Sequence, residues 1–440
     1  MTTINESSAP ARRLQAVASH TSSASSSSQR DQSRDVFLLT LSDGGKISYR
    51  SAAVKGEKNE IVVNDSLILT YTISETQSYA LEVTSVGTRF HGATTHIPKY
   101  PLLTISSPLS STAIPDFWAA IYALFTLYKE NEHIPFIFGS FANADEIRDY
   151  LITTGLARAY PKSELDNPTS KYIQDTKDIL FLSRSSFWQG AGTTGFHRRS
   201  WLLNPREPFP YQPSFTRNEK VIASHPLRPS KPQPGEILYR RWCTHVNQSI
   251  EITFVDLEGI HDGSRSPDGI SRHLAAFHKW HNDERVNKAW GEAGSLEAHR
   301  KYLETVLADP HVLPCMFSWD GELSGYIEIV YTKEDHVAQH YPNGVTPGDW
   351  DRGIHVLVGE SKFLGRERSE IWMRSLIHYI FLSDPRTNFV IGEPDHGNQP
   401  IARVAEKAGF HMQTVIDFPY KRSALNHNPR EKFFKLCRLW

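Results

Sequence analysis

Residues 351–374, DRGIHVLVGESKFLGRERSEIWMR, carry the clearest strand–loop–helix pattern of the C-terminal half. Alternating apolar residues over 353–359 predict a strand, and the apolar spacing over 369–381 predicts a helix. A glycine-containing basic loop joins them. Backbone N–H groups at such a helix N-terminus can bind a pyrophosphate, aided by the helix dipole and by Arg366 and Arg368. The alternative is an ordinary strand–turn–helix unit with solvated arginines.

Strands and helices alternate on both sides of this stretch, which is typical of an α/β layer structure. In the C-terminal half, the expected strands are 249–256, 315–319, 323–332, 388–393 and 411–418, and the expected helices are 270–281, 296–307 and 399–409. Residues 36–204 also have a mixed α/β pattern, in which short β-branched runs precede helices near 115–128 and 142–156.

Length and charge limit the class of protein. A chain of 440 residues exceeds the size that one hydrophobic core usually supports, so two domains are expected. Its 48 basic and 49 acidic residues leave a net charge of -1, which offers no general attraction for nucleic acid or an anionic membrane. The three cysteines lack a CxxC spacing, and no apolar run suits a membrane span or a secretory signal. A soluble, intracellular protein is predicted.

Composition divides the chain into four parts. Residues 1–35 are rich in serine and short of large apolar residues, which predicts a disordered arm. Eight prolines stand between Pro205 and Pro234, and this density predicts a linker without regular structure over 205–238. The two predicted α/β domains are therefore 36–204 and 239–440.

Several segments of the C-terminal half are similar to those of one enzyme family. They are FHKWHNDERVNKAW (277–290), GYIEIVY (325–331), DRGIHVLVGE (351–360), GEPDHGN (392–398) and AGF (408–410). These segments resemble the siderophore acyltransferases, a branch of the GCN5-related N-acetyltransferase (GNAT) fold that includes bacterial aerobactin and mycobactin lysine acyltransferases and fungal hydroxyornithine transacylases. The resemblance implies a GNAT domain over 239–440 that uses acyl-CoA as co-substrate. The N-terminal half matches only the longer fungal members, which implies N5-hydroxyornithine as acceptor. One interpretation of that half is a degenerate copy of the same fold.

The same resemblance implies that His355 and Asp395 face each other across the substrate channel. Attack of a hydroxylamine nitrogen on a thioester requires a base, and histidine suits this task near neutral pH. Asp395 would orient the imidazole or position the acceptor nitrogen. The alternative for His355 is a hydrogen-bonded core histidine.

The coenzyme site is also implied by the resemblance. Backbone N–H groups near Val356 and Val358 would stabilise the developing charge on the thioester oxygen. The residues expected to bind acyl-CoA are Val356, Val358, Gly359, Gly365, Arg366, Arg368 and Asn398. Gly365 corresponds to the central glycine of the diphosphate loop, whereas Glu367 stands where a second small residue is common. Asn398 has an alternative role as a helix N-cap.

The acceptor pocket is expected at Trp280, Asn282, Asp283 and Arg285. Opposite charges such as Asp283 and Arg285 suit the α-amino and α-carboxylate groups of ornithine. In the alternative interpretation, Asn282 and Asp283 cap the following helix and Trp280 belongs to the core.

Other properties are predicted more broadly. No metal is expected, because His273, His278 and His281 do not share one helical face. The donor would be anhydromevalonyl-CoA or acetyl-CoA, and the family implies a homodimer. Arg13, Leu14 and His20 resemble a peroxisomal address, with a chance match and a cytoplasmic location as the alternative. Two other functions stay open: acylation of another amine such as (hydroxy)lysine, and a catalytically silent acyl-CoA-binding or scaffold protein.

Overall fold

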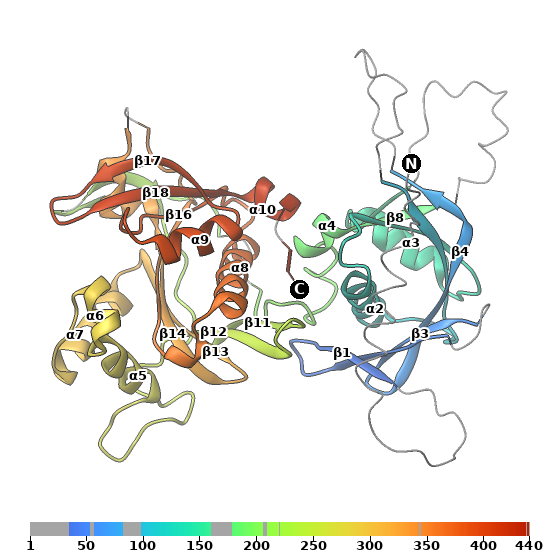
Figure 1. Cartoon of the computed structure of the whole chain (residues 1–440), viewed down its shortest axis with the longest axis horizontal. Coiled ribbons are helices and arrows are strands. Elements are labelled where there is room, and N and C mark those ends of the chain that lie inside the picture. Colours follow the sequence, from blue (N-terminus) through green and yellow to red (C-terminus); the bar gives the residue numbers. More distant parts are fainter. Residues whose placement is uncertain are drawn as a thin grey trace, which may run out of the picture.

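The computed structural model describes residues 35–52, 57–81, 98–159, 178–205, 209–219, 221–342, 345–436 and 438–439. The expected disordered arm up to residue 34, including the candidate peroxisomal address, lies outside these ranges. The described residues form two lobes, each built on one eight-stranded mixed sheet (Figure 1).

The first sheet has the order β1-β2-β3-β4-β5-β6-β8-β7. Its strands are β1 (Val36–Thr40), β2 (Lys46–Arg50), β3 (Asn59–Val63), β4 (Ser66–Tyr79), β5 (Tyr100–Ser106), β6 (His133–Phe138), β7 (Ala157–Ala159) and β8 (Leu180–Ser183). The helices of this lobe are α2 (Ile114–Leu127), α3 (Ala144–Thr153) and α4 (Arg184–Trp188). Helix α2 is buried continuously from Phe117 to Phe125, as expected for a helix that is apolar on more than one face.

The second sheet has the order β11-β12-β13-β14-β15-β16-β18-β17. Its strands are β11 (Ile237–Cys243), β12 (Gln248–Phe254), β13 (Val312–Trp319), β14 (Glu322–Tyr331), β15 (Arg352–Val358), β16 (Phe389–Gly392), β17 (His411–Asp417) and β18 (Arg422–Pro429). The helices are α5 (Arg272–His281), α6 (Glu284–Trp290), α7 (Leu296–Ala308), α8 (Arg366–Ser383), α9 (Gln399–Lys407) and α10 (Arg430–Leu436), with short 3-10 turns η1 (Thr332–Glu334), η2 (His336–His340) and η4 (Ser361–Phe363).

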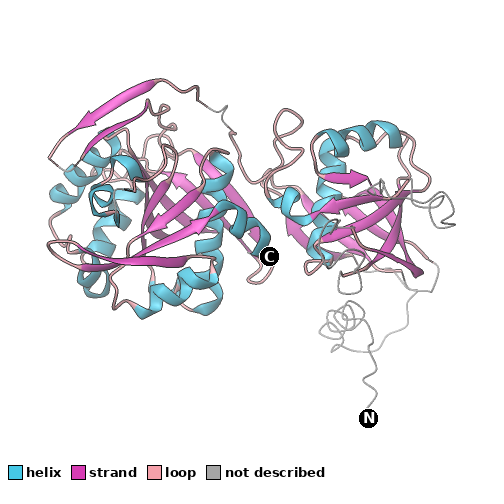
Figure 2. Cartoon of the chain, turned by 90° about the horizontal axis from the view of Figure 1, so that it is seen from above, coloured by secondary structure: helices cyan, strands magenta, loops and turns pink. Residues whose placement is uncertain are grey.

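The two sheets share one topology. In each, the fifth and sixth strands are parallel, and every other neighbouring pair is antiparallel. Helices α2 and α8 occupy equivalent crossovers, as do α3 and α9. The predicted α/β class is confirmed, and the repeated strand order supports the interpretation of the N-terminal half as a second copy of the fold. Figure 2 shows the strands of both lobes with their flanking helices.

Helices cover the two faces of the second sheet differently. Helices α5, α6 and α7 pack on the face that carries Met316, Tyr326 and Leu357. The opposite face, with Ile327 and Ile354, packs on α8 within a core that continues into the first lobe. Alternate residues of β15 therefore face two different environments, as the pleat requires.

The proline-rich segment differs from its prediction. It contains an antiparallel ribbon of β9 (Pro213–Arg217) and β10 (Ile222–Pro226), so the expectation of a linker without regular structure is wrong over these residues. Pro213 and Pro226 form the terminal pair of the ribbon. A proline is tolerated there because the end of an edge ribbon can spare an N–H donor.

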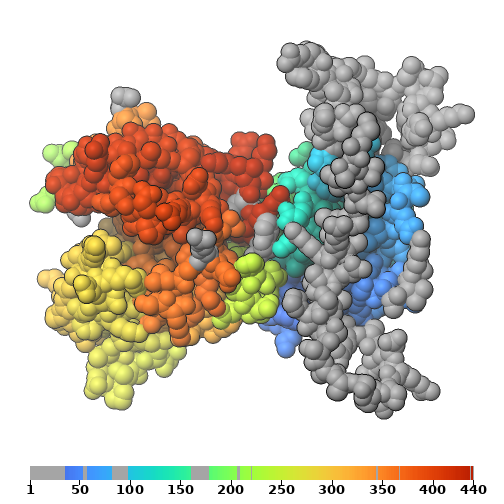
Figure 3. Space-filling view, viewed as in Figure 1, coloured from blue at the N-terminus to red at the C-terminus, as the bar shows by residue number. Residues whose placement is uncertain are grey.

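Aromatic and histidine side chains join the two lobes. The ring of His378 on α8 is fully buried and lies 2.9 Å from the Tyr239 hydroxyl and 2.6 Å from the carbonyl oxygen of Trp188 in α4. Burial lowers the pKa of His378 to about 3, so this ring is a neutral packing element. The red C-terminal segment reaches the first lobe in Figure 3.

Within the described ranges, none of the helices combines the length and apolar composition that a bilayer crossing requires.

Candidate active site

The site is centred on β15, where the second sheet opens. The register between β15 and its parallel neighbour β16 comprises two pairs, at Arg352 and Gly353. On its other edge β15 pairs with β14 from Arg352 to Val358. Backbone groups beyond Gly353 on the β16 side therefore have no partner in that strand. This opening contains Val356 and Val358, where N–H donors for a thioester oxygen are expected.

His355 lies between two carboxylates. Its Nδ1 is 3.1 Å from Oε2 of Glu328, the opposite residue on β14, and its Nε2 is 3.5 Å from Oε1 of Glu393, just after β16. The His355 side chain is 25% exposed, whereas both glutamates are 7% exposed. The imidazole can therefore meet a substrate, while its carboxylate partners are shielded from water.

The carboxylates change the basicity of this ring. Burial alone would lower the pKa of His355, but the charge of Glu393 and the hydrogen bond with Glu328 outweigh it and raise the pKa well above its ordinary value. Burial opposes ionisation of Glu328 as well, yet hydrogen bonds from His355, Tyr302 and Tyr326 hold its pKa below the usual value. The ring and its two carboxylates thus form a strongly polarised unit.

Glu328 is itself held in place by two tyrosines. The hydroxyl of Tyr302 on α7 donates to Glu328 Oε1 at 2.7 Å, and the hydroxyl of Tyr326 donates at 2.9 Å. On the other side, Lys421 Nζ lies 3.5 Å from Glu393 Oε1 and donates to the Glu393 carbonyl oxygen at 3.0 Å. Each carboxylate is therefore fixed by groups from a different segment.

Asp395 has a different environment from the one expected. It is exposed, and its Oδ1 accepts a hydrogen bond from the Gly397 amide at 2.8 Å. Because Glu328 and Glu393 orient the imidazole, the prediction that Asp395 might do so is wrong. Its other predicted task, positioning the acceptor nitrogen, stays a prediction.

The sequence analysis did not identify Glu328 as a site residue. The signal that could have identified it is its charge, because Glu328 stands within the apolar run YIEIVY.

The N-terminus of α8 is open to an anion. Gly365 precedes the helix with φ of +123°, and no side chain caps the first turn. This backbone conformation is almost restricted to glycine, and uncapped N–H groups at a helix start attract negative charge. The side chain of Arg366 is outside the described part of the structure. This conformation supports the interpretation of Gly365 as the glycine of a diphosphate loop, which stays a prediction.

Two other residues expected to bind acyl-CoA have partners within the protein. Arg368 points to the sheet, where its Nη2 donates to Gln248 at 2.7 Å and its guanidinium lies 5.8 Å from the Trp319 ring centre. The Gly359 amide donates to Ser324 at 2.8 Å, and a Cβ there would collide with Trp280. The Gly359 amide and Arg368 Nη2 thus have partners within the protein, whereas Arg368 Nε has none. Direct contacts of Gly359 and Arg368 with the coenzyme stay a prediction.

The remaining predicted residues have capping or packing roles. Asn398 caps α9 through a hydrogen bond from the Ile401 amide, and Asp283 caps α6 by accepting from the Arg285 and Val286 amides. Asn282 bonds to Gly294, Trp280 is 1% exposed with its indole N–H on Glu360, and Arg285 donates to the Gly359 carbonyl oxygen. The alternative of caps and core therefore accounts for these contacts, and the acceptor pocket at these four residues stays a prediction.

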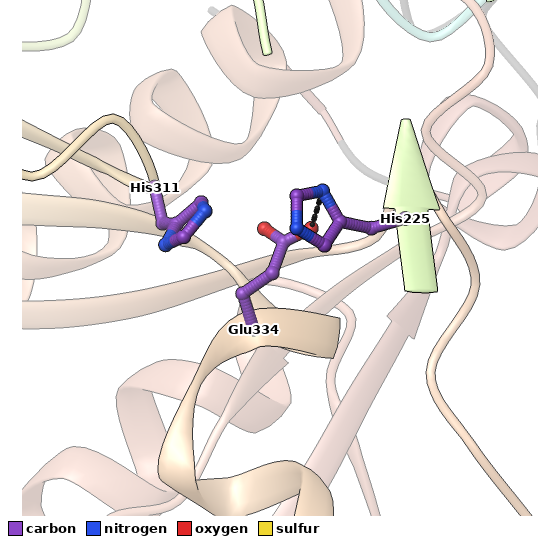
Figure 4. A group of neighbouring side chains, drawn as sticks. All are labelled: His225, His311 and Glu334. Carbon is purple, nitrogen blue, oxygen red and sulfur yellow. Dashed lines mark ion pairs between the residues drawn. The ribbon is translucent and has the colours of Figure 1, made fainter. Parts of the chain in front are cut away.

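A different group of residues has the spacing of metal ligands. Ligand atoms of His225, His311 and Glu334 all lie within 4.8 Å of one another (Figure 4). However, Arg228 forms a bidentate pair with Glu334, and His225 Nε2 lies 2.8 Å from the Thr216 hydroxyl. These partners occupy the ligand atoms and add positive charge, so the described group is a hydrogen-bonded ion pair rather than an open metal site. His273, His278 and His281 belong to no such group within the described ranges.

Comparison with known proteins identifies the family of this chain. Residues 269–418 match the model of the acetyltransferase (GNAT) domain. The chain is 37% identical over 347 residues to acyltransferase ato1 of Omphalotus olearius, which spans 77% of this chain and 80% of that protein. It is 35% identical to hydroxyornithine transacylase SID3 of Ajellomyces capsulatus, over 74% of this chain and 73% of that protein. It is 33% identical to N(5)-hydroxyornithine:cis-anhydromevalonyl coenzyme A-N(5)-transacylase SIDF of Beauveria bassiana, over 76% and 75%. The chain therefore belongs to the family of GNAT-domain acyltransferases that includes the fungal hydroxyornithine transacylases.

Proposed function

We propose that the protein transfers the acyl group of an acyl-CoA to the hydroxylamine nitrogen of N5-hydroxy-L-ornithine, forming a hydroxamate unit of a siderophore. The observation that carries this proposal is the partly exposed His355 between Glu328 and Glu393, beside the opening of β15. Two relatives are named as transacylases of hydroxyornithine, and this supports the choice of acceptor.

The reaction proceeds by attack of the acceptor nitrogen on the thioester carbonyl carbon. The C–N bond forms as the C–S bond breaks, coenzyme A leaves as its thiol, and the nitrogen loses one proton. Neutral His355 accepts that proton, and the two carboxylates stabilise the resulting imidazolium. Backbone N–H groups near Val356 and Val358 stabilise the carbonyl oxygen, and the start of α8 binds the diphosphate. Asp395 positions the acceptor at the exposed rim of the site.

The donor is an anhydromevalonyl or acetyl group carried on coenzyme A. One relative is named for cis-anhydromevalonyl coenzyme A, which supports the larger donor. The active assembly is proposed to be a homodimer. Acylation of another amine and a silent acyl-CoA-binding role remain the competing functions.

The test is release of coenzyme A thiol by the full-length protein. The reaction is run with anhydromevalonyl-CoA or acetyl-CoA and with N5-hydroxyornithine, N6-hydroxylysine, ornithine or lysine as acceptor. We expect release that depends on hydroxyornithine and is faster with anhydromevalonyl-CoA. Faster release with hydroxylysine would reassign the acceptor, and coenzyme A binding without release to any acceptor would favour the silent binding protein.

A further inference from the structure

A cavity of about 130 Å³ lies on the face of the second sheet that α8 covers. It is bounded by β13, β14 and β15, by the end of α8, and by the proline-rich segment around Lys231. Successive side chains of a strand point to opposite faces of the sheet. Arg352 and His355 are three positions apart on β15, so this face is opposite to the one that carries His355. The cavity is therefore distinct from the candidate active site.

Arg352 is the unusual residue of this cavity. The residue is 9% exposed, its Nε has no hydrogen-bond partner, and no described carboxylate forms an ion pair with it. Its guanidinium lies 3.8 Å from the centre of the Tyr331 ring, on which it stacks. A buried guanidinium normally has an anionic partner, because removing the charge from water is costly. The structure thus leaves an unneutralised cation at the cavity wall.

Lys231 adds a second positive group. Its Nζ donates to the carbonyl oxygens of Val306 and Leu307 at 2.7 Å each, which leaves one of the three ammonium donors unused by these bonds. Burial lowers the pKa of Lys231 to about 8, so the amine is still largely protonated at neutral pH. Lys231 and Arg352 both line the cavity. Their charges lower the pKa of the buried Cys315 thiol, although the larger effect of burial raises it.

The other charged groups around the cavity are already paired. Asp384 accepts from Arg386 Nε and Nη2 at 2.9 and 2.7 Å, and Arg386 Nη1 donates to the Phe209 carbonyl oxygen. His311 faces Asp309 with its Nδ1 at 3.2 Å and the Thr216 hydroxyl with its Nε2 at 3.3 Å. The net charge that the described walls present to a ligand is therefore positive.

We propose that this cavity binds a small organic carboxylate. The planar guanidinium of Arg352 matches a carboxylate in geometry and can donate two parallel hydrogen bonds to it. Leu238, Leu313 and Ile329 supply an apolar wall for a short alkyl group. One water needs roughly 10–15 Å³ of such space, so the cavity is large enough for a ligand of a few heavy atoms. This site does not depend on the proposed acyl-transfer reaction.

The experiment measures propionate binding to the full-length protein by calorimetry at constant ionic strength. Propionamide serves as the neutral isostere and inorganic phosphate as the competing oxyanion. We expect one propionate per chain and no binding of propionamide. Arg352→Met should weaken propionate binding about 10- to 100-fold, as expected for loss of a charge-assisted pair. Arg272→Met, which removes an exposed arginine on α5, is the matched control and should bind like wild type.

Thermal unfolding provides the second measurement. Without propionate, Arg352→Met should be at least as stable as wild type, because it removes an unpaired buried charge. If this variant does not fold, Arg352→Lys decides the question, because lysine keeps the charge without the planar fork and should bind propionate several-fold more weakly. Absence of propionate binding to wild type would overturn the proposal. Tighter binding of phosphate at Arg352 would overturn the carboxylate assignment.

Discussion

The β5–α2–β6 and β15–α8–β16 units have the same topology but differ at the point where their parallel strands meet. In the first lobe, β5 pairs with β6 at Leu103, Thr104 and Ile105, and the Gly139 amide adds a bond to the Ile105 carbonyl oxygen. In the second lobe, pairing stops at Gly353, the second residue of β15. One copy of the fold is therefore closed towards the end of its fifth strand, and the other is open.

The side chains near the middle of the two strands also differ in chemistry. The fourth of the seven residues of β5 is Leu103, opposite Ile73, whereas the fourth residue of β15 is His355, opposite Glu328. Gly139 follows β6 where Glu393 follows β16. Strand pairing and apolar side chains fill this place in the first copy, whereas an unpaired strand edge and charged groups form the candidate site in the second. Among the described residues, the end of β5 therefore has no counterpart of the His355 group.

The largest effect is expected from His355→Ala. Loss of a positioned base should lower kcat roughly 10²- to 10⁴-fold without abolishing it, because the backbone donors remain. The matched variant is Leu103→Ala, which should cost about 2–5 kcal/mol of unfolding free energy and leave kcat unchanged. Steady-state kinetics and chemical denaturation of both variants test the contrast. Wild-type turnover of His355→Ala would refute the assignment of the site.

Gly365→Ala should raise the KM for acyl-CoA about tenfold, because a side chain at φ of +123° strains the loop by ~1–3 kcal/mol and moves the N–H groups at the start of α8. Gly155 in the first lobe also has a positive φ and open space around it. Gly155→Ala should therefore lower thermal stability and leave this KM unchanged. Equal KM values in both variants would exclude the α8 N-terminus as the diphosphate site.

Glu328→Gln should move the pH profile of kcat/KM to lower pH. The reactive form of His355 is neutral, so activity rises with pH through the His355 pKa, which the two carboxylates raise. Removing one carboxylate lowers that pKa, and the half-maximal point moves down with it. Glu60→Gln, which removes a paired glutamate from the first sheet, is the control and should leave the profile in place. An unchanged profile in Glu328→Gln would show that another group titrates.

The smallest effect is expected from Asp283→Ala. Helices α5, α6 and α7 lie between β12 and β13, and this helical cover distinguishes the second lobe from the described part of the first. Loss of the Asp283 cap should reduce the free energy of unfolding by about 1 kcal/mol. The KM for the acceptor should not change, and a large rise in it would restore the predicted acceptor pocket.

Periodicity and family motifs in the chain were enough to predict the main elements and the central residue of the candidate site. The periodicity of residues 353–359 and 369–381 predicts β15 and α8, and both are confirmed because local alternation follows directly from strand and helix geometry. The family segments indicated His355 and the glycine before α8. The caps at Asp283 and Asn398 were also readable, since a cap bonds to N–H groups only a few residues away.

The groups that surround His355 could be identified only from the folded chain. Glu328 is 27 positions away in sequence, and it faces His355 because β14 and β15 pair in one particular register. A shift of one residue would turn Glu328 to the other face, so its charge within an apolar run marks it as unusual but does not identify His355 as its partner. The choice of Glu393 rather than Asp395, the opening of β15, and the unpaired charge of Arg352 likewise depend on segments that meet only when the sheet is complete.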